Sequence, residues 1–264
     1  MSLVGNLFSS SIGRKFLMAT TGLVLVGFIF GHLAGNLQIF SHPDKINGYA
    51  EFLHSLGPAL WLVRLGLLAC FATHVWAAVV LTWENRSARG PEAYGVKRFL
   101  RASLASRYMR LSGGVVLAFV VYHLLHFTIG LPNDDQFKDA LPTYRMAADY
   151  KVLGFPVVMA GEAVKDVYSM VFLGFGHPLI SLFYVLAVGL LSVHLWHGAD
   201  SMFQTFGWRS AKWAPNLSRA VVALTLIYFV ANLAIPGAIL AGAVQPQGET
   251  YAAALAATEA VATR

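Results

Sequence analysis

The sequence predicts an all-α integral membrane protein in which five transmembrane helices form a bundle, and three observations support this fold class. Hydrophobic residues make up 57% of the chain and charged residues only 12%, a departure from soluble composition that long apolar segments produce. Five nearly uncharged stretches reach the roughly 20 residues that cross a bilayer core. Four of these stretches also contain a histidine. The expected helices span about residues 16–40, 58–83, 109–131, 177–206 and 217–240.

The first helix belongs to an uncharged run over 16–43. This run is longer than the apolar core of a signal peptide, so we expect it to persist in the mature chain. The second and fourth helices begin near Pro58 and Pro178, and proline suits the first turn of a helix. Together the helices predict one membrane domain over 1–240. The tail, 241–264, is rich in alanine and is expected to be flexible.

Lysine and arginine are distributed unevenly between the predicted loops. With the amino terminus in the cytoplasm, the inner segments hold twelve of the 19 basic residues: Arg14, Lys15, Arg86, Arg89, Lys97, Arg98, Arg101, Arg107, Arg110, Arg209, Lys212 and Arg219. The outer loops hold only Lys45, Lys138, Arg145, Lys151 and Lys165. This bias favours a cytoplasmic amino terminus and an outer carboxyl terminus. It accounts for the net charge of +6 without a nucleic acid partner.

Cysteine content excludes one kind of redox centre. Cys70 is the only cysteine, so the chain forms no internal disulfide and holds no iron–sulfur cluster by its own thiolates. No strand followed by a glycine-rich phosphate loop is predicted either. Any iron–sulfur cluster that this protein serves must therefore belong to a partner.

Four of the five predicted helices carry an internal histidine, and helical rise places these residues at two depths. His32 and His123 lie about 25 Å and about 20 Å from the inner ends of their helices, so both belong to the outer half. His74 and His194 each lie about 24 Å from the outer end of a helix that runs inward, near the inner surface. Two histidines are therefore predicted at each depth.

An internal similarity supports the same pairing. The segments TGLVLVGFIFGH (21–32) and SGGVVLAFVVYH (112–123) share a hydroxyl residue, a glycine, an apolar body and a final histidine without a gap. The second and fourth helices share HVW (74–76) and HLW (194–196). The two matches indicate a parallel repeat of two helices, which brings equivalent histidines face to face.

Paired histidines across a dry helical bundle fit two haem groups, each with two axial imidazoles, because the porphyrin edge is apolar and iron occupies the ring nitrogens. Gly27, Gly31 and Gly35 form a groove beside His32 that admits either a flat macrocycle or a neighbouring helix. The simpler interpretation of any one such histidine is a hydrogen bond to a neighbouring helix. Four histidines at paired depths favour haem.

The helices resemble those of the di-haem cytochrome b membrane anchor of succinate:quinone oxidoreductases and quinol:fumarate reductases, the single-chain, five-helix type. The resemblance covers the chain to about residue 240 and rests on ATTGLVLVGFIFGH (19–32), FATHVW (71–76), RLSGGVVLAFVVYH (110–123) and SVHLWHGADSMFQTFGW (192–208). It implies that His74 and His194 bind the proximal haem iron, nearest the cytoplasmic subunits. It also implies that His32 and His123 bind the distal haem iron.

The resemblance further implies function and partners. It predicts electron transfer between a partner's iron–sulfur clusters and menaquinone through two b haems in the bacterial cytoplasmic membrane, with no dehydrogenase activity in this chain alone. The partners are a flavoprotein subunit and an iron–sulfur subunit that dock on the basic inner face. The seven basic residues of loop 84–110 would contact these subunits or lipid headgroups. The alternative is that their charge only sets the orientation of the chain in the membrane. A higher oligomer of the complex stays open, as does the choice between succinate oxidation and fumarate reduction.

Quinone chemistry moves protons as well as electrons, so its site needs a titratable group close to a haem. Members of the family use a glutamate in the first outer connection, and Glu51 in YAEFLHSLG (49–57) is the nearest match. His42 and His54 are alternative proton carriers in the same loop. Both are equally explained as solvated loop histidines.

Other polar residues are candidate partners of haem propionates. His126 and His197 each follow a candidate ligand by three residues and share its helix face approximately. Arg64 lies about 9 Å into the second helix, where it either neutralises a distal propionate or extends to the outer interface. The candidates for the inner haem are Arg14, Lys15, Arg107 and Arg110, and Asp200 is expected to pair with one of these four.

Two other functions compete with electron transfer. A histidine-rich di-iron oxygenase would use HLLH (123–126) and HLWH (194–197), but it needs many histidines on one face, and these clusters fall at opposite depths. A proton or metal-ion transporter would use the histidines as a relay, but the sequence has no intramembrane carboxylate near His32 or His123.

Overall fold

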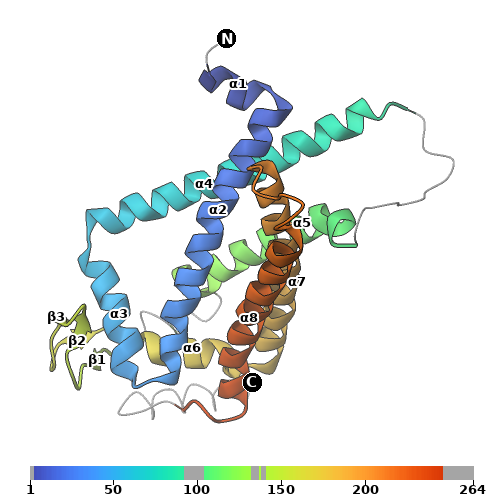
Figure 1. The fold of residues 1–264 in the computed structure, drawn as a ribbon. Coiled ribbons are helices and arrows are strands. Elements are labelled where there is room, and N and C mark those ends of the chain that lie inside the picture. Colours follow the sequence, from blue (N-terminus) through green and yellow to red (C-terminus); the bar gives the residue numbers. More distant parts are fainter. Residues whose placement is uncertain (1–2, 92–103, 132–136, 138–140, 246–264) are drawn as a thin grey trace. The chain divides into compact units, whose positions relative to one another are not determined.

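The computed structural model describes residues 3–91, 104–131, 137 and 141–245, and most of them are helical (Figure 1). Among these residues, five helices are long and apolar enough to span a membrane, as predicted. They are α2 (Ser11–Asn36, extended by the 3-10 turn η1, Leu37–Phe40), α4 (Pro58–Ala88), α5 (Leu104–His123, extended by the π-helical η2, Leu124–Ile129), α7 (Pro178–Thr205) and α8 (Ala214–Leu240).

The helix boundaries follow from local chemistry. Pro58 and Pro178 are the first residues of α4 and α7, as predicted, because a proline in the first turn gives up no helical hydrogen bond. By contrast, α2 and α5 begin earlier than expected and α4 ends later. An apolar run predicts only the part of a helix that would contact lipid. The helix itself is longer, because its hydrogen bonds continue into the charged residues that follow.

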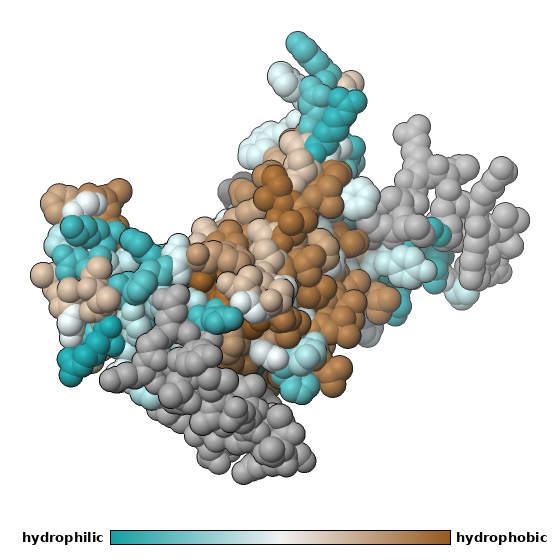
Figure 2. All heavy atoms as spheres, turned by 90° about the horizontal axis from the view of Figure 1, so that it is seen from below, coloured by the Kyte–Doolittle hydropathy of each residue, from teal (hydrophilic) through white to brown (hydrophobic). Residues whose placement is uncertain are grey.

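Large apolar side chains are exposed along the spanning helices, among them Leu62, Leu65, Leu182 and Ile227. Figure 2 shows brown, hydrophobic residues over much of the visible surface, interrupted by teal, hydrophilic ones. Exposure of apolar area to water costs roughly 25 cal/mol per Å², so such a surface is stable when lipid covers it. The described part of the chain is therefore a multi-pass membrane protein by length and composition of its helices.

The connections contain structure that the all-α prediction missed. Two further helices lie there, α3 (Pro43–Ser55) and α6 (Val167–Gly176), and α1 (Leu3–Ser9) precedes α2. In the described part of the chain, four short strands form two antiparallel pairs: β1 (Tyr144–Arg145) with β4 (Ala163–Val164), and β2 (Tyr150–Val152) with β3 (Phe155–Val158). We call α3, the four strands and α6 the cap. The all-α class holds for the spanning helices but not for the cap.

The chain groups into two compact units. Unit 1 comprises Met1–Phe30, Trp61–Gly113 and Ser192–Ile227, and unit 2 comprises Gly31–Leu60, Gly114–Leu191 and Tyr228–Arg264. Each spanning helix contributes residues to both units. The four internal histidines divide in the predicted way, because the pair His74 and His194 falls in unit 1 and the pair His32 and His123 in unit 2. Most of the predicted tail, 246–264, lies outside the described residues.

Buried carboxylates organise the cap within unit 2. Asp44 of α3 accepts hydrogen bonds from the backbone amides of Ala147 (2.9 Å) and Ala148 (3.0 Å) and from the hydroxyl of Tyr144 (2.9 Å). Asp166 caps α6 by accepting from the backbone amide of Ser169 at 2.9 Å. An apolar cluster of Ile39, Ile46, Tyr168, Ile235, Ile239 and Val244 packs α3 and α6 against the end of α8.

Candidate functional site

The structure brings together His32 of α2 and His123 of α5, the predicted pair in unit 2. Their ring centroids lie 5.8 Å apart, with the ring planes at 82°. Nδ1 of His123 is buried and has no hydrogen-bond partner among the described residues. An unpaired buried polar atom costs about 1–3 kcal/mol, and in a native structure it calls for an explanation such as a bound ligand.

Open space lies beside this pair along the glycines of α2. A Cβ added at Gly31, or at Gly27 about one turn earlier, would meet no atom within 4 Å. A Cβ at Gly35 would lie 2.6 Å from the ring of Tyr49, which belongs to α3. Of the two occupants predicted for this groove, a neighbouring helix takes the end at Gly35. At Gly27 and Gly31, beside His32, no protein atom fills the space that a side chain would take.

The pair in unit 1 is held by hydrogen bonds at Nδ1. Nδ1 of His74 lies 3.0 Å from the carbonyl oxygen of Met18 and 3.4 Å from Oγ1 of Thr21, both on α2. Nδ1 of His194 lies 3.3 Å from Oγ of Ser112 on α5. Both histidines belong to unit 1.

These contacts determine which ring nitrogen each histidine presents. The hydroxyls of Thr21 and Ser112 donate to carbonyls of their own helices, at 2.7 Å to Leu17 and 3.0 Å to Met109. The carbonyl oxygen of Met18 can only accept, so Nδ1 of His74 carries the proton, and a hydroxyl that donates to its own helix can accept from the Nδ1 that it faces. Nε2 is then the unprotonated nitrogen, with its lone pair available to a metal.

The contacts repeat in the way that the sequence repeats. Thr21 and Ser112 stand at the start of the two similar segments, and a glycine follows each of them. A Cβ at Gly22 would lie 3.3 Å from Cε1 of His74, and one at Gly113 would lie 3.4 Å from Cε1 of His194. The hydroxyl thus binds the ring and the glycine makes room for it. Sequence reasoning missed this role, although the matched hydroxyl and glycine were its signal.

His126 lies in an aromatic cluster of unit 2. It is fully buried, and its Nδ1 lies 3.0 Å from the hydroxyl of Tyr184. Its ring stacks on Phe137 with a centroid distance of 5.3 Å and an angle of 10°. Its Nε2 has no partner among the described residues. The predicted role of His126 beside a propionate stays a prediction.

The predicted cations have different surroundings. Arg14 is buried and bonds Glu84 of α4 and the carbonyl oxygens of Phe8 and Ser9, which occupies several of its donors. Arg64 is exposed, and its guanidinium lies 5.1 Å above the ring of Trp61. Lys15, Arg107 and Arg110 are exposed. The expected pairing of Asp200 with one of the four inner cations is wrong, because Asp200 binds Arg209 at 2.7 Å.

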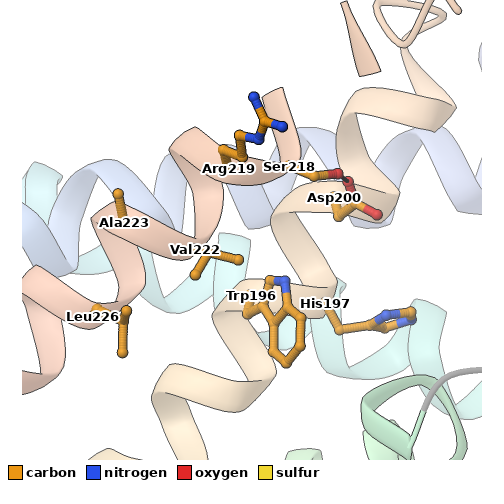
Figure 3. Close-up of a pocket in the computed structure, with 8 residues that line it drawn as sticks. All are labelled: Trp196, His197, Asp200, Ser218, Arg219, Val222, Ala223 and Leu226. Atoms are coloured by element: carbon orange, nitrogen blue, oxygen red, sulfur yellow. Dashed lines mark hydrogen bonds between the residues drawn. The ribbon is translucent and has the colours of Figure 1, made fainter. Parts of the chain in front are cut away.

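The remaining predicted residues belong to the cap and to α7. Glu51 is half-buried in α3, whereas His54 is exposed at its last turn. His42 precedes α3, with Nδ1 3.1 Å from a carboxylate oxygen of Asp44. His197 lines a groove beside α8 together with Asp200 (Figure 3).

Where the structure describes the chain, the candidate ligands occur as pairs of imidazoles. Among the described residues, no group of three or more histidine, cysteine, aspartate or glutamate side chains converges to hold a metal ion. A di-iron oxygenase needs such a group, so the described residues do not support that competing function. Comparison with known protein families, characterised proteins and solved structures finds no match to this chain.

Proposed function

We propose that this chain is the membrane-anchor cytochrome b subunit of a succinate:quinone oxidoreductase, and that it passes electrons between an iron–sulfur subunit and menaquinone by way of two b haems. The single observation that carries the proposal is the presence of two histidine pairs, one in each unit, at equivalent places of an internal repeat. The same electron-transfer path through two haems would serve a quinol:fumarate reductase, in which electrons move in the opposite direction.

The side chains fit two bis-histidine haem sites. His74 and His194 would hold one iron, and hydroxyl and carbonyl oxygens already bind their Nδ1 atoms. His32 and His123 would hold the other, beside the open positions at Gly27 and Gly31. A bound haem supplies one-electron transfer. The helices contribute fixed ligand orientation and a dry surrounding, both of which tune its potential.

The proposed quinone chemistry needs a proton carrier in the same unit as the distal pair. Glu51 belongs to unit 2 and is half-buried in α3, so its carboxylate can exchange protons with water while staying close to the membrane. We assign to it the proton transfer that accompanies quinone reduction or oxidation. His42 and His54 are the alternatives in the same connection.

The proposed orientation and partners follow from charge. The amino terminus lies in the cytoplasm of a bacterium, and the flavoprotein and iron–sulfur subunits bind the basic inner face. Arg86, Arg89, Arg107 and Arg110 of that face are exposed, whereas Lys97, Arg98 and Arg101 lie outside the described residues. No dehydrogenase activity is expected from this chain alone.

A difference spectrum of the purified chain, dithionite-reduced minus oxidised, tests the proposal. We expect two low-spin b haems per polypeptide, of which His32→Ala loses one and His74→Ala loses the other. His54→Ala, which removes an exposed histidine of the cap, is the matched control and should keep both. A purified chain without haem would contradict the proposal and favour a histidine relay.

A further inference from the structure

A groove lies between α7 and α8 near the connection that joins them, entirely within unit 1. It has a volume of about 510 Å³, and its lining includes Trp196, His197, Asp200, Arg219, Val222 and Leu226. Figure 3 shows Val222 of α8 beside the ring of Trp196 of α7, with Asp200 and Arg219 toward the other end. The groove therefore has an apolar part and a charged part.

The charged part carries a positive charge that the described residues do not balance. Asp200 accepts hydrogen bonds from Arg209 at 2.7 Å and from Ser218 at 3.0 Å, so its charge is already paired. Arg219 is exposed, and no described carboxylate lies within ion-pair distance of it. An anion is the ligand that this end of the groove can bind most favourably.

The groove lies where a lipid headgroup layer is expected. The connection between α7 and α8 holds the exposed tryptophans Trp208 and Trp213, with Lys212 5.9 Å above the ring of Trp213. Tryptophan and basic residues gather at the membrane–water interface. Arg219 and Leu226 are about two helical turns, or roughly 10 Å, apart, so a ligand that fills the groove has a charged end and a long apolar end.

We propose that this groove binds an anionic phospholipid, whose phosphate pairs with Arg219 and whose acyl chain lies along Val222, Leu226 and Trp196. A quinone also has an apolar tail, but its neutral head gives no charge for Arg219 to balance. Leu226 of the groove is exposed, as are Leu224, Ile227 and Val230 of the same helix. The lipid site depends on neither haem nor partner subunits.

Native mass spectrometry of the purified chain tests the proposal, with equimolar phosphatidylglycerol and phosphatidylcholine. We expect the wild type to retain phosphatidylglycerol several-fold more than phosphatidylcholine. Arg219→Gln should remove this preference, and Arg219→Lys should keep part of it. Arg145→Gln, which removes an exposed arginine of β1 in the cap, is the matched control and should behave like the wild type.

A second variant tests the acyl-chain part of the groove. Val222→Phe narrows the space beside Trp196 and should reduce retention of phosphatidylglycerol while Arg219 is still present. Glycerophosphoglycerol, the headgroup without acyl chains, should not displace the bound lipid. Full displacement by this soluble headgroup would show a simple phosphate site. That result, or an unchanged lipid preference in Arg219→Gln, would overturn the proposal.

Discussion

The side-chain oxygen of Ser112 lies 3.3 Å from Nδ1 of His194 and donates its own proton to the carbonyl of Met109. When its proton is engaged with this carbonyl, the hydroxyl oxygen accepts from the ring, and the lone pair is then on Nε2. Thr21 has the same relation to His74. Two hydroxyls, at equivalent places of the repeat, orient the two candidate ligands of unit 1.

Removal of a hydroxyl should weaken the proposed haem binding in unit 1 alone. Mutation of a group that orients a metal-bound histidine costs typically 10–100-fold in affinity, so we expect losses of this size for Ser112→Ala and Thr21→Val. Haem retention on dilution and the midpoint potentials of both haems are the measurements. The second proposed haem, at His32 and His123, should keep its potential.

Two further variants test whether the hydroxyl of Ser112 orients His194 or whether loss of any polar group has the same effect. Ser112→Thr retains a hydroxyl and should retain haem. Thr20→Val removes the neighbouring hydroxyl of α2, which is exposed, and should change neither haem. If Ser112→Ala behaved like Thr20→Val, the hydroxyl would have no part in positioning His194.

Gly31 tests whether the open space beside His32 holds a cofactor. A Cβ at Gly31 or at Gly66 of α4 meets no protein atom within 4 Å, so leucine at either position should fold. If a macrocycle occupies the space beside His32, Gly31→Leu lowers the haem content at that pair and Gly66→Leu does not. The spectrum of each variant, with haem quantified per chain, gives the answer. Equal haem in both variants would place no cofactor beside Gly31.

The spanning helices were predictable because lipid imposes one requirement, a long apolar run, that a sequence displays directly. The nearness of His32 and His123 was predictable because the repeat between 21–32 and 112–123 has no gap and places the two histidines at equivalent positions. The cap was not predictable in the same way. Its strands are two to four residues long, too short for a periodic pattern, and Asp44 joins residues about a hundred positions away.

The partner of Asp200 shows a second limit. Asp200 lies near the end of α7, as expected. Position along a helix does not give the direction of the side chain around the helix or the path of the next connection. The connection after α7 folds back and brings Arg209 and Ser218 to Asp200. Side-chain pairing of this kind depends on a turn whose geometry the sequence pattern did not indicate.

Arg14 should contribute strongly to the stability of unit 1. It is buried and joins α4, through Glu84, to the carbonyl oxygens of Phe8 and Ser9. Loss of one partner from a buried ion pair costs 3–5 kcal/mol, and Glu84 is partly exposed, so we expect about 3 kcal/mol for Arg14→Ala. Thermal or denaturant unfolding measures it. Lys15→Ala, at the exposed neighbouring position, should change stability by less than about 0.5 kcal/mol.

The same residue also tests its predicted role beside the inner haem. Arg14→Lys keeps the charge but loses the forked hydrogen bonds, so it should lower stability less than alanine does. A shift in the potential of the haem at His74 and His194 would support a propionate contact. Lower stability with an unchanged potential would assign Arg14 to structure alone.

Tyr144 should make the stability of the cap depend on alkaline pH. Burial, followed by its hydrogen bond to Asp44, raises the pKa of Tyr144 above the ordinary value, so the folded cap favours the neutral phenol. The stabilisation is complete below the pKa of an unfolded tyrosine, about 10. It is lost as pH rises above that value, because the unfolded chain then releases the proton more readily than the folded chain does.

Limited proteolysis of the cap between pH 8 and pH 11 measures this dependence. Tyr144→Phe loses the bond to Asp44 at every pH, which should cost about 1–3 kcal/mol because a charged acceptor is left with one donor fewer. Its cleavage rate should therefore be higher at pH 8 and rise less steeply toward pH 11 than that of the wild type. Tyr108→Phe, at an exposed position of α5, should follow the wild-type curve. Parallel curves for Tyr144→Phe and the wild type would mean that the phenol of Tyr144 does not link the cap to pH.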